Sequence, residues 1–109
     1  MYLKTNKNNY KIEVANNFYK RLTGFIGKKN INYGILFPKC NKIHTYFMKE
    51  NIDIVGLDEN NEVIYKYENL AKNKVVKVAN SIKKTSILEM PASSTKKIKI
   101  GSILLFNED

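Results

Sequence analysis

The chain has 109 residues, with 19 basic and 10 acidic side chains, and this length predicts a single domain over residues 1–109. One cysteine and one histidine exclude a disulfide framework and a multi-cysteine or two-histidine metal centre, so we expect neither a metal nor a cofactor. The apolar runs are too short to span a membrane and the first residues lack the apolar segment of a secretory signal, which favours a cytoplasmic protein.

The first elements in chain order are two short strands, predicted at residues 2–5 and 10–14 around a polar turn. In the second strand Ile12 and Val14 alternate with charged neighbours, which is the period of a half-buried strand.

A helix is predicted near residues 16–26, because an asparagine at its start suits the N-cap and apolar side chains then recur at helical spacing. Gly24 or Gly27 suits a left-handed residue at its end.

The clearest later feature is a hairpin formed by residues 52–57 and 62–67, since the asparagines between them tolerate the positive φ of tight turns. Further strands are predicted at residues 34–37, 43–48, 75–78, 85–90 and 102–106. About eight short strands with one helix predict a mostly β (α+β) domain with a small, β-barrel-like sheet.

Five short motifs follow one another along this chain: RLTGFI at 21–26, GILF at 34–37, HTYFMK at 44–49, DIVGLD at 53–58, and LEM at 88–90 with Ile100-Gly101. In this order they resemble the motifs of the domain-of-unknown-function 192 family. Phe47 stands where that family usually has tryptophan, Pro91-Ala92 replaces the Ala-Gly that usually comes after the LEM-type motif, and Ser102 replaces its usual aspartate. The resemblance implies a small, mostly β, barrel-like domain and implies no function.

Two carboxylates, Asp53 and Glu89, lie among apolar residues of predicted strands. Burying an unpaired carboxylate costs several kcal/mol, so each is either held by partners or part of a site. The first interpretation, which we prefer, is a polar core network with Arg21, His44 or Thr45. In the second, the two carboxylates converge as general acid and base.

Arg21 is the only arginine in this lysine-rich chain, and its planar donor fork suits a carboxylate or a phosphate. We expect it either to bind such a ligand or, preferably, to tie the helix end to Glu89 or Asp53. Cys40 and His44 are spaced closely enough for a nucleophilic dyad, but no nucleophile motif surrounds the cysteine. We therefore favour a histidine that is either hydrogen-bonded in a structural role or exposed.

The candidate binding residues are Arg21, His44, Thr45, Met48, Asp53 and Glu89. Our first hypothesis is a non-enzymatic module that binds a small molecule or a protein partner through these residues. The alternative is a small hydrolase or transferase that uses Asp53, Glu89 and His44. A nucleic-acid accessory role ranks lower, because base and phosphate recognition favour arginine over lysine.

Overall fold

The computed structural model describes residues 1–4, 9–17, 21 and 23–108. Its strands are β1 (Tyr2–Lys4), β2 (Asn9–Val14), β3 (Gly34–Phe37), β4 (Lys42–His44), β5 (Ile52–Leu57), β6 (Val63–Leu70), β7 (Val75–Lys77), β8 (Ser86–Pro91) and β9 (Phe106–Asn107). The expected mostly β architecture is therefore confirmed. No helix within these residues is long and apolar enough to cross a membrane.

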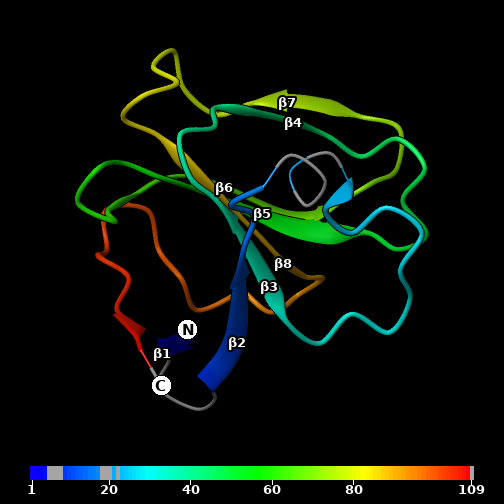
Figure 1. Cartoon of the computed structure of the whole chain (residues 1–109), viewed down its shortest axis with the longest axis horizontal. Coiled ribbons are helices and arrows are strands. Elements are labelled where there is room, and N and C mark those ends of the chain that lie inside the picture. Colours follow the sequence, from blue (N-terminus) through cyan, green and yellow to red (C-terminus); the bar gives the residue numbers. More distant parts are fainter. Residues whose placement is uncertain (5–8, 18–20, 22, 109) are drawn as a thin grey trace.

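Seven of these strands form one mixed sheet in the order β6-β5-β8-β3-β2-β1-β9. Only the β2–β3 pair is parallel, so the chain between these two strands crosses over one face of the sheet. β4 and β7 pair separately, as a small antiparallel ribbon. In Figure 1 the turn near residues 21–26 lies between this ribbon and the large sheet.

The barrel-like closure predicted from the sequence is wrong, because within the described residues the sheet stays open between β6 and β9. The two edges approach at one end only. There the Val63 amide donates to the Ser102 carbonyl at 2.8 Å, and the Leu104 amide donates to the Asn61 carbonyl at 2.9 Å. These bonds join the start of β6 and the residue pair before it to the irregular segment before β9. Among the described residues they form one isolated bridge, between Glu62 and Ile103, and not a continuous strand pairing.

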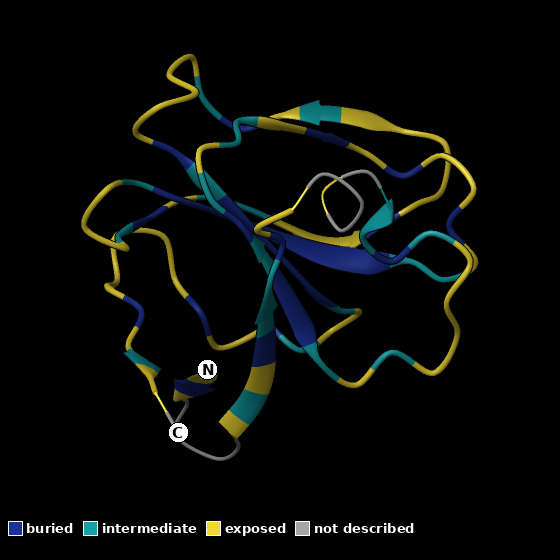
Figure 2. Cartoon of the chain, in the orientation of Figure 1, coloured by how far each residue is buried: buried dark blue, intermediate teal, exposed yellow. Residues whose placement is uncertain are grey.

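The sheet is buried on both faces at its centre, as the dark-blue middle strands of Figure 2 show. All six residues of β5 are buried. Because successive side chains point to opposite faces, Ile52 and Ile54 enter one hydrophobic cluster while Val55 and Leu57 enter another. The two faces of β5 and β8 therefore offer two separate environments for a polar side chain.

The predicted hairpin is confirmed as β5 and β6. At its turn the Asp58 Oδ1 accepts hydrogen bonds from the backbone amides of Asn60 at 2.8 Å and Glu62 at 2.9 Å. Asn61 has a φ of 62°, which asparagine tolerates better than most residues.

Two predicted strands are too long. β4 ends at His44 instead of residue 48, and the backbone turns through Phe47, whose φ is 64°. The Thr45 hydroxyl donates to the Ala71 carbonyl and accepts from the Lys74 amide, both at 2.8 Å. This local side-chain bonding holds a turn where residue propensity alone favours a strand. The last strand likewise shortens from 102–106 to Phe106–Asn107.

The predicted helix falls partly on residues 18–20 and 22, which lie outside the described residues. Within the described part, Arg21 and Thr23 have helical backbone, and the Arg21 amide donates to the Asn17 carbonyl at 3.1 Å. A turn follows, in which Gly24 and Gly27 have φ values of 46° and 76°. The expected left-handed glycines after this segment are confirmed.

Candidate functional site

Glu89 is the most unusual polar residue of the central strands. It lies on β8 between β3 and β5, and only 4% of its surface is exposed. Its Oε1 atom is buried and has no hydrogen-bond partner among the described residues. Burial raises the pKa of the Glu89 carboxyl from an ordinary value of 4.5 to about 8, because desolvation disfavours the charged form. The carboxyl is therefore mostly protonated at neutral pH.

A cavity of about 110 Å³ opens beside this carboxyl. Three elements enclose it: the turn after Arg21, the end of β3 with the loop to β4, and β4 itself. Its lining comprises Arg21, Thr23, Gly24, Phe25, Ile26, Phe37, Cys40, Lys42, Ile43, His44, Met48 and Glu89. We call this space the Glu89 cavity. Its walls combine aromatic and aliphatic side chains with three basic groups, the composition expected of a small-molecule site.

Arg21 lies at this cavity but does not bind either carboxylate. Its Nη1 donates to the Pro38 carbonyl at 2.7 Å, and its Nη2 donates to the Lys39 carbonyl at 3.3 Å. The expected tie from Arg21 to Glu89 or Asp53 is therefore wrong. Instead, the guanidinium fixes the turn to the loop after β3, which closes one side of the cavity.

Gly24 approaches the Glu89 carboxyl closely. A Cβ atom at this position would lie 3.2 Å from both the Glu89 Oε1 and the Phe37 Cζ. Its positive φ adds a second requirement for glycine, because a side chain there strains the backbone.

We expect the substitution Gly24→Val to lower the free energy of unfolding by about 2 kcal/mol or more, through backbone strain and contact with Glu89 and Phe37. Chemical denaturation measures this change. Gly27→Val is the matched control, because Gly27 also has a positive φ but a Cβ there would meet nothing within 4 Å. Equal losses in the two variants would contradict the role of close packing at Gly24.

His44 and Cys40 both line the cavity, yet the structure does not direct them at one another. The Cys40 thiol donates to the Lys42 carbonyl at 3.3 Å. The His44 ring is exposed and stacks on Tyr46, with ring centroids 5.2 Å apart. This arrangement does not support a Cys–His dyad and matches the expectation of an exposed histidine.

Asp53 lies on the opposite face of the sheet from Glu89. In the antiparallel register Asp53 pairs with Met90, and Ile54 pairs with Glu89. Paired residues share a face and neighbouring residues alternate, so the two carboxyl groups point to different sides. They cannot act together as general acid and base, and that part of the enzymatic hypothesis is wrong.

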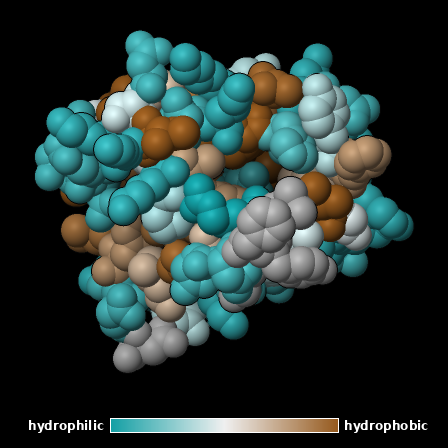
Figure 3. All heavy atoms as spheres, turned by 45° about the horizontal axis from the view of Figure 1, so that its top comes forward, coloured by the Kyte–Doolittle hydropathy of each residue, from teal (hydrophilic) through white to brown (hydrophobic). Residues whose placement is uncertain are grey.

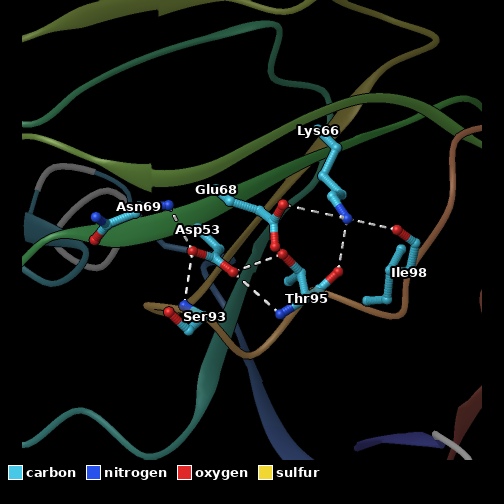
Figure 4. Close-up of polar contacts among 7 residues, drawn as sticks. All are labelled: Asp53, Lys66, Glu68, Asn69, Ser93, Thr95 and Ile98. Atoms are coloured by element: carbon cyan, nitrogen blue, oxygen red, sulfur yellow. Dashed lines mark hydrogen bonds and ion pairs between the residues drawn. The ribbon is translucent and has the colours of Figure 1, made fainter.

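The Asp53 carboxylate is fully buried and well satisfied (Figure 4). Its Oδ1 accepts from the backbone amides of Asn69 at 2.8 Å and Ser93 at 3.0 Å. Its Oδ2 accepts from the Thr95 amide at 3.0 Å and the Thr95 hydroxyl at 2.6 Å. These bonds join β5 to β6 and to the turn after β8. We expected Arg21, His44 or Thr45 as partners, and none of them contributes to these bonds.

Of the six candidate residues, the cavity brings together Arg21, His44, Met48 and Glu89. Thr45 and Asp53 are buried elsewhere in hydrogen-bonded structural roles. Lys42 and Gly24 are cavity residues that the sequence analysis did not select as site residues. The sequence contained one signal for Gly24. It lies three residues after the only arginine, within the same RLTGFI motif, which indicates that the two residues belong to one site.

Comparison with known proteins places this fold in a family. The family model DUF192, described as Uncharacterized ACR, matches residues 1–104. The chain belongs to the DUF192 family. The resemblance inferred from the five motifs is thus confirmed.

Two curated relatives are UPF0127 proteins from Thermococcus sibiricus and Thermococcus kodakarensis. Each is 33% identical over an alignment of 60 residues, and the match covers 50% of this DUF192 chain. The matched segment spans only 39% and 38% of the lengths of those proteins.

Two solved structures share the fold at low sequence identity. A protein of unknown function from Novosphingobium aromaticivorans has a TM-score of 0.75 at 14% identity, over 96% of this chain and 82% of its own. A "putative transcription regulator" from Sinorhizobium meliloti has a TM-score of 0.76 at 15% identity, over 95% and 89%. At such identity the similarity establishes the DUF192 fold alone.

Proposed function

We propose that this domain binds a small molecule in the Glu89 cavity and does not catalyse a reaction. The observation that carries the proposal is the unpartnered Oε1 of Glu89, a buried oxygen beside an open space. Leaving such an atom unsatisfied costs about 1–3 kcal/mol, and a ligand that hydrogen-bonds to it recovers part of that cost.

The lining indicates the size and character of the ligand. A dry cavity of roughly 150 Å³ is known to hold benzene, which has six non-hydrogen atoms, so about 110 Å³ encloses roughly four or five non-hydrogen atoms of a ligand. Phe37, Ile43 and Met48 provide apolar contact. The protonated Glu89 carboxyl provides one donor and one acceptor. The ligand is therefore expected to have a polar group and a short apolar body.

A binding role fits the arrangement better than catalysis. Glu89 has the raised pKa of a general acid, but Asp53 is on the other face and the Cys40 thiol is bonded to a backbone carbonyl. A hydrolase built on Glu89 and His44 would therefore lack both its second carboxylate and an activated nucleophile.

A protein partner is the other form of the binding hypothesis. On the face seen in Figure 3, hydrophobic side chains form small separate groups among hydrophilic ones. Protein-binding patches are usually larger and continuous, so this face supports a small ligand more than a docked protein.

The test is a thermal-shift screen of polar molecules of about four to six non-hydrogen atoms, a range set by the cavity volume. Ligands of the cavity should raise the melting temperature of the wild-type protein and fail to do so for Glu89→Leu. Glu59→Gln is the matched control, since Glu59 is exposed in the turn between β5 and β6. Ligands that stabilise all three proteins equally, or a screen without any stabilising compound, would contradict the proposal.

A further inference from the structure

We infer that the ligand of the Glu89 cavity is a small organic carboxylate, which accepts a hydrogen bond from Glu89 beneath the basic groups of Arg21, Lys42 and His44. This inference rests on the proposed function and specifies its ligand class.

Charge in the cavity favours an anion. Arg21 and Lys42 carry permanent positive charges, and His44 adds a third basic group. Among the described lining residues Glu89 is the only acidic one, and its burial keeps it protonated at neutral pH. A cationic ligand would need an ionised Glu89 and would lie close to three basic groups. Two like charges about 6 Å apart repel by roughly 3 kcal/mol at an effective dielectric constant of 20.

Other charged groups on this face support the same assignment. Glu13 on β2 pairs with Ile35 on β3, which pairs with Glu89, so the two glutamates lie in one row, two strands apart. Two strand spacings are about 10 Å. Glu13 lines a separate cavity of about 280 Å³ with Lys28, beyond the Gly24 turn. Glu13 therefore lies outside the described lining of the Glu89 cavity, whose own glutamate is kept protonated by burial.

The hydrogen-bonding groups match a carboxylate. A protonated carboxyl donates its O–H to a carboxylate oxygen, and such charge-assisted bonds are short and strong. Arg21 is held at the cavity by the carbonyls of Pro38 and Lys39, while a guanidinium has five N–H donors in total. Arg21 is the one arginine of this lysine-rich chain, and it lines this cavity. Its guanidinium is a planar donor that can form more than one hydrogen bond to a carboxylate.

The experiment uses three molecules with one skeleton and different charge: lactate, lactamide and 1-amino-2-propanol. Each is titrated by NMR at pH 6.5 against protein carrying ¹³C-labelled glutamate, and the side-chain carboxyl resonance of Glu89 is followed. We expect lactate to shift this resonance and to bind at least tenfold more tightly than the neutral and cationic molecules. Arg21→Gln should weaken lactate binding about tenfold.

The pH dependence provides the second readout. Lactate affinity in the wild-type protein should fall about tenfold between pH 7 and pH 9, because ionised Glu89 repels the ligand and no longer donates. Glu89→Gln keeps a donor without a charge, so its affinity should change much less over the same range. Cys40 and His44 also line the cavity and are unchanged in this variant, which isolates the effect of Glu89.

Tighter binding of lactamide or 1-amino-2-propanol at these residues would overturn the assignment of an anion and leave the cavity as a binding site. Absence of any Glu89 shift with all three molecules at 50 mM would overturn the carboxylate inference. The thermal-shift screen decides the proposed function separately, because its result depends on Glu89→Leu and not on these three molecules.

Discussion

Replacing Asp53 with asparagine is expected to destabilise the protein by about 3 kcal/mol, because an NH₂ group then faces the Thr95 amide, where an acceptor is needed. For a domain of this size the melting temperature should fall by roughly 12 °C or more. Differential scanning calorimetry and urea denaturation measure the two quantities. Asp53→Leu removes all four hydrogen bonds and should be worse still.

Asp58→Asn is the matched control for this change. Both hydrogen bonds recorded at Asp58 are accepted by its Oδ1, and asparagine retains that oxygen. We therefore expect a change below about 0.5 kcal/mol, as for ordinary surface substitutions. Similar losses in Asp53→Asn and Asp58→Asn would show that the buried network has no special importance.

The stability of the wild-type protein relative to Glu89→Gln is expected to fall as the pH rises from about 4.5 to 8. The folded state raises the pKa of Glu89 to about 8, so it binds more protons than the unfolded state throughout this interval. Stability therefore decreases with pH, by up to about 1.4 kcal/mol per unit. The total difference is on the order of 5 kcal/mol. Below pH 4.5 and above pH 8 the difference should be constant.

Urea denaturation of both proteins between pH 4 and pH 9 measures this difference directly. The comparison is repeated in a His44→Asn background, where the same slope should remain. A pH-independent difference between the wild-type protein and Glu89→Gln would show that Glu89 is ionised in the folded state, and would remove the donor that the proposed ligand requires.

The sequence allowed the β5–β6 hairpin and the glycine turn to be predicted because both depend on local preferences. Alternating residues and a tolerant asparagine specify the hairpin, and Gly24 supplies the left-handed backbone. The length of β4 was not predictable in this way. Thr45 bonds to Ala71 and Lys74, which are far away in the sequence, and these bonds override the strand preference of the aromatic residues that follow.

The site was only half predictable for a similar reason. Asp53 and Glu89 have the same signature in the sequence, a carboxylate between apolar strand residues. The register between β5 and β8 decides whether the two carboxylates lie on the same face of the sheet or on opposite faces. A shift of one residue in this register would move the side chains of one strand to the other face. The partners of Asp53 are mainly backbone amides, and these cannot be identified from residue types because nearly every residue has one. The unmet hydrogen bond of Glu89 is visible only in three dimensions.

The parallel pairing of β2 and β3 also has a consequence for how ligand choice can change over time. The segment that connects these strands includes Arg21 and Gly24, which line the Glu89 cavity, and its described residues supply no strand to the large sheet. Insertions, deletions or substitutions in this segment can change the entrance of the Glu89 cavity while the hydrogen bonds between the strands of the large sheet stay intact. Diversification within such a lineage should thus concentrate in the part of this segment outside the RLTGFI motif, and grafting that part between homologues offers a direct route to transfer specificity.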